Sequence, residues 1–376
     1  MKFLIDKFTV DKAVWLETQN NSFKRLEENK PKDQKIDRPT ILATASLYLM
    51  QVEKDKLLEK LNKENPDKIF FMGVEQNVQM SPDNLSYDLK SYYFDDLDQF
   101  KLDIDPEHKF FIPADSEKKV EEFLKNFISE YSFRVPVIKD KVEQGDLVSI
   151  EIYDMEDNMQ GTYFLEGKNV NEANLLKFLE NKNLTDKHQT VLNEQDVKIK
   201  VASIYQFKKM PITDENIHLL QMENVKTLED VKEFIRFQTF QQIVIDQLFN
   251  YGQEIMLQIN RENLAKIDFQ PDLLASESDP VKFAAYNIKG DYKQIALETI
   301  TNYFWTMLFI KKLQIIVSRD DIEIEFNRFR QVLGQEAYSI PLFKIANTVL
   351  YKKLGLYYLQ KLQPEDFAKY SKYFSK

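Results

Sequence analysis

The chain has 376 residues, of which 43% are hydrophobic and 30% charged, and its formal net charge is −10. This composition supplies enough apolar surface for two or three packed domains, and no apolar run reaches the roughly 20 residues of a membrane-spanning helix. The absence of cysteine excludes disulfides, thiol catalysis and cysteine-bound metals. Because the chain is charged again by Asp6, we expect no secretory leader and a cytoplasmic protein.

Residues 1–110 are predicted to form an α+β domain. Its first elements are a pair of strands at the apolar runs 3–5 and 14–16, leading into 23–28. A helix at 40–62 follows, and then strands at 69–72 and 85–94 separated by a turn at 81–84. Between the strand pair and the helix lies a proline-bounded basic loop at 30–39.

Residues 111–139 are predicted to form a linker helix, followed by a small β-rich domain at 140–208. The helix carries an apolar stripe at three- and four-residue spacing: Val120, Phe123, Leu124, Phe127, Ile128 and Tyr131. The strands of the β-rich domain are expected at 147–153, 162–165 and 197–205, with Gly145 and Gly161 at turns.

Residues 209–376 are predicted to be helical. The longest helix is expected at 227–259, with Thr227 as its N-cap and acidic residues in its first turn. At 1.5 Å per residue it spans roughly 50 Å, which is typical of an arm or strut. After a loop at 268–280, further helices are expected at 293–317, after a Ser318 cap, at 340–362 and at 365–374.

The sequence contains no phosphate-binding loop, dinucleotide-binding motif or nucleophile elbow. The three histidines (His108, His188 and His218) lie far apart, so a histidine zinc site is not expected. The acidic run at 95–105 lacks the glycine and closing glutamate of a calcium loop, which favours a solvated turn. We therefore expect no metal and no cofactor.

Two features remain as functional candidates. The loop at 30–39 carries Lys32, Lys35 and Arg38, which would suit phosphate-rich RNA, but an ordinary solvated loop has the same composition. The helical region carries an excess of apolar side chains, notably around Phe237 and at 304–309. A helix that is apolar nearly all round is either buried on several sides or offers a partner site.

Four short pieces occur in order along the chain: 142–150 (VEQGDLVSI), 197–205 (VKIKVASIY) followed by 208–215 (KKMPITDE), 227–232 (TLEDVK) and 316–322 (IVSRDDI). In these pieces and in the order of its parts, the chain resembles the bacterial trigger factor family. The resemblance implies a ribosome-docking N-terminal domain, an FKBP-like middle domain and a helical C-terminal chaperone domain with extended arms.

Two departures from the family pattern affect what can be carried over. The family's docking loop has the form G-F-R-x-G-x-x-P, whereas residues 33–39 read DQKIDRP. Lys32, Lys35 and Arg38 are therefore docking candidates by charge and position only. The stretch 168–183 lacks the aromatic, Phe-x-Pro-Gly-containing segment that shapes the family's prolyl isomerase pocket. Isomerase activity is therefore not expected.

The resemblance implies an ATP-independent chaperone for unfolded or nascent polypeptides, possible contact with the large ribosomal subunit, and no membrane or specific DNA partner. The residues predicted to contact clients are Phe234, Phe237, Met256, Phe304, Trp305 and Met307. Two alternatives stay open: an active prolyl isomerase, and a scaffold or assembly protein with one fixed partner.

Overall fold

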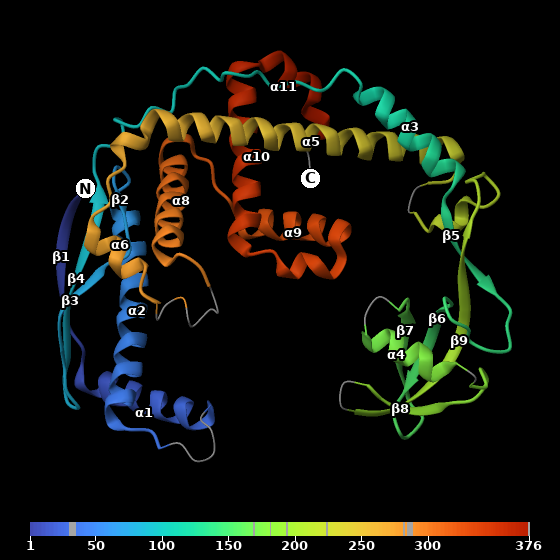
Figure 1. Cartoon of the computed structure of the whole chain (residues 1–376), viewed down its shortest axis with the longest axis horizontal. Coiled ribbons are helices and arrows are strands. Elements are labelled where there is room, and N and C mark those ends of the chain that lie inside the picture. Colours follow the sequence, from blue (N-terminus) through green and yellow to red (C-terminus); the bar gives the residue numbers. More distant parts are fainter. Residues whose placement is uncertain are drawn as a thin grey trace. The chain divides into compact units, whose positions relative to one another are not determined.

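The computed structural model describes residues 1–29, 35–167, 170–180, 182–192, 195–222, 225–280, 283 and 289–374. The chain forms two compact units, each described here by itself (Figure 1). Unit 1 contains residues 1–110 and 247–369, and unit 2 contains 111–246 and the residues from 370 onward. The predicted α+β class is confirmed, since helices accompany two antiparallel sheets. The units cut across the four domains predicted from the sequence.

Unit 1 begins with a four-stranded antiparallel sheet and two helices. The elements are β1 (Lys2–Thr9), α1 (Lys12–Asn29), α2 (Arg38–Glu64), β2 (Ile69–Phe70), β3 (Val74–Met80) and β4 (Leu85–Phe94). The long β4 pairs with each of the other three strands. Trp15 of α1 and Leu49 of α2 pack against Leu85 and Leu89 of β4, which fixes both helices on one face of the sheet.

The predicted strand pair within 1–30 is wrong in its second member, and β3 was not predicted. Residues 14–16 lie in α1. The Asp11 Oδ1 accepts hydrogen bonds from two backbone N–H groups at the start of this helix, at 2.8 Å from the Ala13 nitrogen and 3.3 Å from the Val14 nitrogen. An aspartate at this position favours a helix start. Trp15, which looked like part of a strand, is the buried anchor of the helix.

The remaining elements of unit 1 are helical. They are the second half of α5 (Leu228–Asn263), η2 (Leu264–Lys266), α6 (Pro271–Glu277), α8 (Tyr292–Leu313), α9 (Arg319–Leu333), η3 (Gly334–Ser339), α10 (Leu342–Leu362) and α11 (Pro364–Tyr370). The cap predicted at Ser318 is confirmed, and it takes the form of a capping box, because Ser318 and Asp321 each accept a hydrogen bond from the other's backbone N–H group.

One aromatic core joins the sheet of unit 1 to its helices. The ring centroids of Phe94 and Phe304 are 5.0 Å apart, those of Phe100 and Phe304 4.8 Å, and those of Phe71 and Phe269 5.6 Å. Such ring pairs stabilise a core beyond the area that they bury. For this reason residues 1–110 do not form a domain separate from the helices at 247–369.

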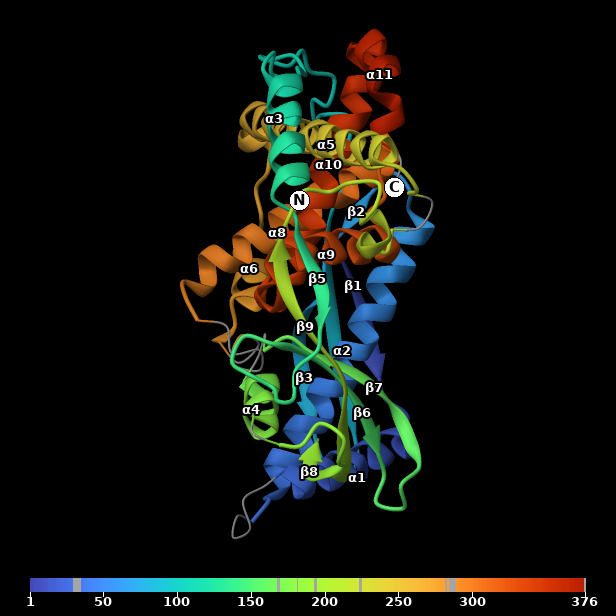
Figure 2. The ribbon, with the colours of Figure 1, turned by 90° about the vertical axis from the view of Figure 1, so that its right-hand side faces the viewer.

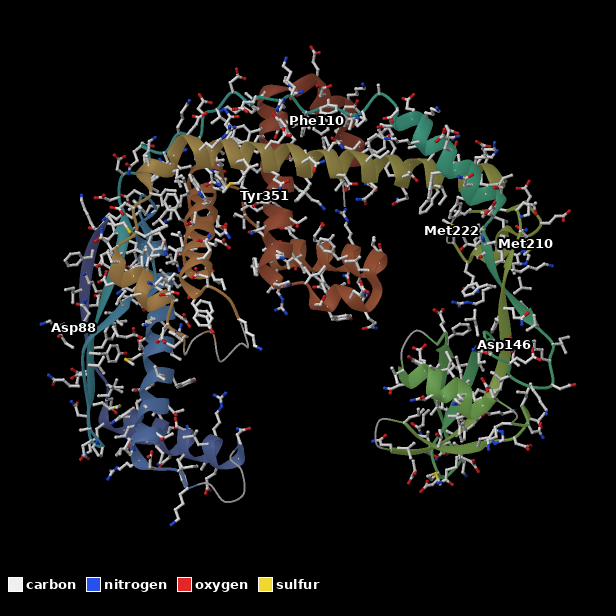
Figure 3. The ribbon with its side chains drawn as sticks, viewed as in Figure 1. Asp88, Phe110, Asp146, Met210, Met222 and Tyr351 are labelled. Atoms are coloured by element: carbon white, nitrogen blue, oxygen red, sulfur yellow. The ribbon has the colours of Figure 1, made fainter. Side chains whose placement is uncertain are left out.

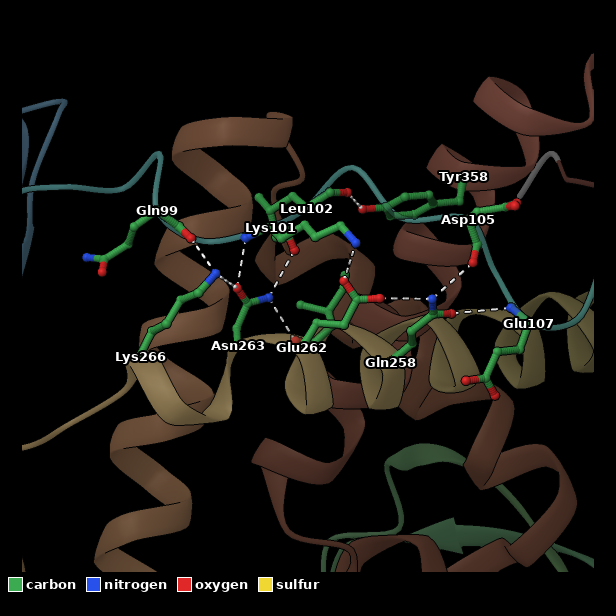
Figure 4. Close-up of polar contacts among 11 residues, drawn as sticks. Gln99, Lys101, Leu102, Asp105, Glu107, Gln258, Glu262, Asn263, Lys266 and Tyr358 are labelled. Carbon is green, nitrogen blue, oxygen red and sulfur yellow. Dashed lines mark hydrogen bonds and ion pairs between the residues drawn. The ribbon is translucent and has the colours of Figure 1, made fainter.

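Residues 101–110 form neither helix nor strand and run along α5 (Figure 4). The Asn263 side chain accepts a hydrogen bond from the Lys101 N–H (2.8 Å) and donates one to the Lys101 carbonyl (2.9 Å). Gln363 holds Phe110 in the same two-bond manner, at 2.8 and 3.0 Å. These amide side chains satisfy backbone groups that a neighbouring strand would otherwise pair.

Unit 2 contains a five-stranded antiparallel sheet, the helix α3 (Ser116–Ser129) and the helix α4 (Val170–Leu179). The strands are β5 (Ser132–Val137), β6 (Leu147–Tyr153), β7 (Met159–Leu165), β8 (His188–Leu192) and β9 (Gln195–Lys209). β9 pairs with β5, β6 and β8, and Figure 2 shows β5 beside the end of β9. α4 packs Leu175 and Leu179 onto this sheet.

The boundary predicted between the linker helix and the β-rich domain, at residues 139 and 140, falls inside unit 2. β5 pairs with β9 from Ser132 opposite Lys209 to Val137 opposite Ile204, so the sheet begins before residue 140. Gly161 lies inside β7, next to an irregularity in its pairing with β6, and not in a turn as predicted.

The first half of α5 completes unit 2. The Asp230 N–H donates to the Thr227 hydroxyl at 3.2 Å, which confirms Thr227 as the cap of the predicted long helix. Val231 of α5 packs with Phe133 of β5, with Ile212, and with Ile217 of the 3-10 helix η1 (Ile217–Leu220).

Candidate polypeptide-binding surfaces

The described residues contain no group of three or more histidine, cysteine, aspartate or glutamate side chains that could hold a metal ion. Within the same ranges, every helix falls short of the length and hydropathy that a membrane span requires. The candidate sites are exposed apolar surfaces.

Three of the six side chains predicted to contact clients lie in the core of unit 1. Phe304 and Trp305 are 0% exposed and Met256 is 5% exposed. The apolar circumference of α8 is explained by burial: Phe304 contacts the Phe94 and Phe100 rings of the sheet region. A side chain without exposed area cannot contact another chain, so these three are assigned to the core.

The other three predicted residues keep accessible area. Phe234 and Phe237, on α5 in unit 2, are 43% and 36% exposed. Met307 on α8 is half-buried. Only these members of the predicted set remain candidates for contact with a client.

Unit 1 contains a groove between α5, α8 and α10 with a volume of about 550 Å³. We call it the α8–α10 groove. Its apolar lining includes Phe249 of α5 and Tyr351 of α10, whose ring centroids are 5.8 Å apart, together with Leu297 and Phe343. Figure 3 marks Tyr351 on α10. Burial raises the pKa of Tyr351, so its ring is uncharged at neutral pH.

The rim of the α8–α10 groove is polar. Gln294 and Glu298 come from α8, and Lys344 and Asn347 from α10. The amide side chains of Gln294 and Asn347 can both donate and accept hydrogen bonds, so they suit the main chain of a bound polypeptide. One acid and one base leave the rim without a strong charge preference.

An exposed apolar strip continues from this groove. Its members are Val332 and Leu333 at the end of α9, Tyr338 in η3, and Leu342 and Phe343 at the start of α10. Val332 is 83% exposed and Leu342 66%. Large apolar side chains gathered on adjoining elements mark interaction surfaces more often than isolated ones do.

Ion pairs hold α9 against α10, and one of them includes the buried Glu325. Both Glu325 oxygens lie 2.7 Å from the Lys352 Nζ, and Asp321 pairs with Lys353. Burial raises the pKa of Asp321, but hydrogen bonds from Lys353 and Ser318 outweigh it and bring the pKa to about 2. The two helices that carry most of the apolar strip, α9 and α10, are therefore held together by ion pairs at neutral pH.

Unit 2 contains a second groove of about 490 Å³, which we call the α3–α5 groove. Its apolar lining includes Val120 of α3, Phe237 and Phe240 of α5, and Tyr373. Arg236 of α5 ties the two helices together by donating to both carboxylate oxygens of Glu121, at 2.6 and 3.3 Å.

The basic loop is described only in part. Lys32 lies outside the described residues. Lys35 and Arg38 are exposed, and Arg38 is the first residue of α2. Asp37 caps this helix by accepting the Thr40 N–H at 2.8 Å, and hydrogen bonds from Thr40 lower the pKa of Asp37. The cap holds the two basic residues beside a helix start.

The sheet of unit 2 has a smaller cavity of about 360 Å³ between α4 and β8. Among its described lining residues only Phe178 is aromatic. A prolyl isomerase pocket with aromatic walls is not found at this place in the described part of the chain.

Sequence reasoning missed Leu297, Leu342 and Phe343. Phe343 lies two residues from the buried Ile345, or about 200° around the helix, so it falls off the buried stripe of α10. The sequence signal was the segment 340–343 (IPLF), in which a proline lies among three large apolar residues. That segment could be interpreted only once the buried face of α10 was known.

These features define a multi-unit α+β protein whose candidate sites are apolar grooves with polar rims. No protein-family model and no curated protein matches the chain. Among solved structures it is similar to one described as "Promiscuous Substrate Recognition in Folding and Assembly Activities of the Trigger Factor Chaperone". The TM-score is 0.30 and the identity 13%, with 94% of this chain and 96% of that chain covered. Values this low establish neither family nor function.

Proposed function

We propose that this protein is an ATP-independent chaperone, similar to trigger factor, that binds exposed apolar segments of unfolded or nascent polypeptides. The observation that carries the proposal is the α8–α10 groove with its adjoining apolar strip. Leu297, Leu342 and Phe343 expose area that the fold of unit 1 does not need for its core. An apolar segment of an unfolded chain has the complementary chemistry.

The expected affinity follows from the size of the surface. Burying one large apolar side chain contributes roughly 1.5–3 kcal/mol, so two or three contribute roughly 3–9 kcal/mol. Lost freedom of the client offsets part of this gain. Binding in the micromolar range or weaker follows, because about 8 kcal/mol corresponds to 1 μM. Release at this affinity needs no nucleotide.

The protein's charge suits this role. A net charge of −10 keeps a complex with an apolar client soluble. The polar rim of Gln294, Glu298, Lys344 and Asn347 gives hydrogen-bonding partners to a client's main chain without selecting one sequence.

Client binding is tested with dansylated, carboxymethylated lactalbumin, a chain kept unfolded by blocked thiols. The double variant Leu342→Ser/Phe343→Ser is expected to weaken binding about tenfold or more, because two apolar contacts are removed. The matched control is Val78→Ser/Met80→Ser, which changes two exposed apolar side chains of β3. Equal affinity in wild type and the groove variant, or an equal loss in the control, contradicts the assignment.

We further propose that Lys32, Lys35 and Arg38 contact ribosomal RNA of the large subunit in a bacterial cytoplasm. The support is charge and exposure: a basic loop beside a helix start suits phosphate. Co-sedimentation with ribosomes should fall with salt and be lost in Lys35→Glu/Arg38→Glu. Wild-type protein that stays in the supernatant at low salt would refute docking and leave a free cytosolic chaperone.

Two other functions make different predictions. A scaffold would give one stoichiometric partner in a pull-down, whereas a chaperone gives many clients in small amounts. A prolyl isomerase would accelerate a protease-coupled proline peptide assay well above background. The scarcity of aromatic side chains around the α4–β8 cavity argues against the isomerase.

A further inference from the structure

The α3–α5 groove is partly filled by the chain itself. The Tyr373 ring centroid lies 5.1 Å from that of Phe237 and 5.0 Å from that of Phe240, and the Tyr370 centroid lies 6.4 Å from that of Phe240. The Gln241 side-chain amide donates to the Tyr373 carbonyl at 3.2 Å. Residues 370–374 thus contact α5 through both rings and main chain.

The remaining groove is open and its rim is acidic. Phe237 stays 36% exposed beside Tyr373, and about 490 Å³ of space adjoins them. Glu117 and Glu233 stand on the rim. The segment 370–374 itself brings a base, Lys372, to this rim. The segment therefore matches the groove in ring chemistry and in charge.

We propose that residues 370–374 act as an intramolecular ligand of the α3–α5 groove, which an unfolded polypeptide must displace to reach those parts of the Phe237 and Phe240 rings that Tyr373 covers. The proposal rests on the proposed chaperone function and adds a regulation to it. The apparent affinity of a site that is open only part of the time falls by the open fraction. Residues 370–374 then cover part of the Phe237 and Phe240 rings until a client competes for the α3–α5 groove.

Substitution of Tyr373 tests this regulation in the full chain. Tyr373→Ala removes two ring pairs, and pairs of this kind change an equilibrium by about two- to tenfold each. We expect Tyr373→Ala to bind carboxymethylated lactalbumin about 4- to 100-fold more tightly than wild type, the product of the two ring pairs. Tyr373→Phe keeps the rings and should bind like wild type. Tyr163→Ala, an exposed tyrosine of β7 in the same unit, is the matched control and should not change the affinity.

A further variant identifies the surface that is uncovered. In the Tyr373→Ala background, Phe237→Ser should abolish the gain in affinity, because the gain requires the exposed face of α5. Unchanged or weaker binding by Tyr373→Ala overturns the proposal. A gain that survives Phe237→Ser also overturns it, since the client would then bind elsewhere.

Thiol labelling separates this proposal from the chaperone function. The chain has no cysteine, so Gln241→Cys introduces a unique thiol beneath the Tyr373 carbonyl. Its labelling rate should rise several-fold when Tyr373→Ala is added, whereas a thiol at the exposed Glu229 should label at one rate in both backgrounds. An unchanged rate at 241 overturns the proposal alone. Absence of client binding in wild type and every variant overturns the chaperone function and, with it, the displacement step.

Discussion

The crossing of α5 and α10 depends on two glycines and gives the sharpest stability prediction. A Cβ at Gly252 would lie 1.8 Å from the Tyr351 carbonyl oxygen, and one at Gly355 would lie 2.4 Å from the Leu248 carbonyl oxygen. Both obstacles are backbone atoms of the facing helix, so no side-chain rotation relieves them. The helices must separate if either glycine gains a methyl group.

The magnitude follows from two opposed effects. Overpacking a close contact costs about 1–3 kcal/mol and occasionally more, and a backbone obstacle places Gly252→Ala at the upper end. Alanine in place of a helical glycine recovers about 1 kcal/mol. We expect Gly252→Ala to lower the free energy of unfolding of unit 1 by about 2 kcal/mol or more, with Gly355→Ala close behind. Gly73→Ala is the matched control, because its Cβ would meet the Leu89 side chain at 3.2 Å.

Urea unfolding followed by tryptophan fluorescence measures this difference. Both tryptophans of the chain, Trp15 and Trp305, lie buried in unit 1, so the signal reports this unit. Separation of α5 from α10 should also disturb the α8–α10 groove, since Phe249 and Tyr351 flank the crossing. A Gly252→Ala midpoint equal to that of wild type or of Gly73→Ala would show that the helices part at no cost and would refute this reasoning.

Three further stability predictions use the same fluorescence assay. Asn263→Ala should cost about 1–3 kcal/mol, because it removes both bonds to Lys101 from a fully buried position; an unaltered midpoint would contradict the role of the amide. Glu325→Ala should cost about 3 kcal/mol and Glu325→Gln less, since the carboxylate is paired with Lys352 in a buried site; equal losses would exclude a charge effect. The pKa of Asp321 is lowered from 3.8 to about 2 by folding, so its stabilisation is present above about pH 4 and is lost as the pH falls toward 2. Wild type should exceed Asp321→Asn in stability by about 1–2 kcal/mol at pH 6, after allowance for solvent screening, and by little near pH 2; a constant difference would contradict the pKa.

The elements that are predicted best from the sequence are those whose signals are local. The caps at Thr227 and Ser318 are short-range hydrogen-bond patterns, and both occur as expected. The strand expected at 14–16 failed because short apolar runs suit strands and helices alike, and the Asp11 cap that decides for a helix was overlooked. The grouping into two units could not be predicted, because it depends on ring contacts between residues far apart in the chain, such as Phe94 with Phe304.

The candidate site was predicted less well than the fold. Composition indicates that α8 is unusually apolar, but it cannot tell a core such as Trp305 from a surface such as Leu297. That distinction is set by the sheet packed on one side of α8 and by α10 on another. Phe237 was predicted as a client contact because apolar side chains cluster around it, whereas the contact of Tyr373 with it joins residues 136 positions apart and has no sequence signal.

Site-directed photo-crosslinking tests most directly whether unfolded polypeptides lie in the α8–α10 groove. Because the chain lacks cysteine, Asn347→Cys within the groove can carry a single benzophenone maleimide. We expect this probe to crosslink to carboxymethylated lactalbumin and excess unlabelled client to suppress the product. A probe at the exposed Glu59 of α2 should give little product. Equal crosslinking from both positions, or none from position 347, would contradict binding in this groove.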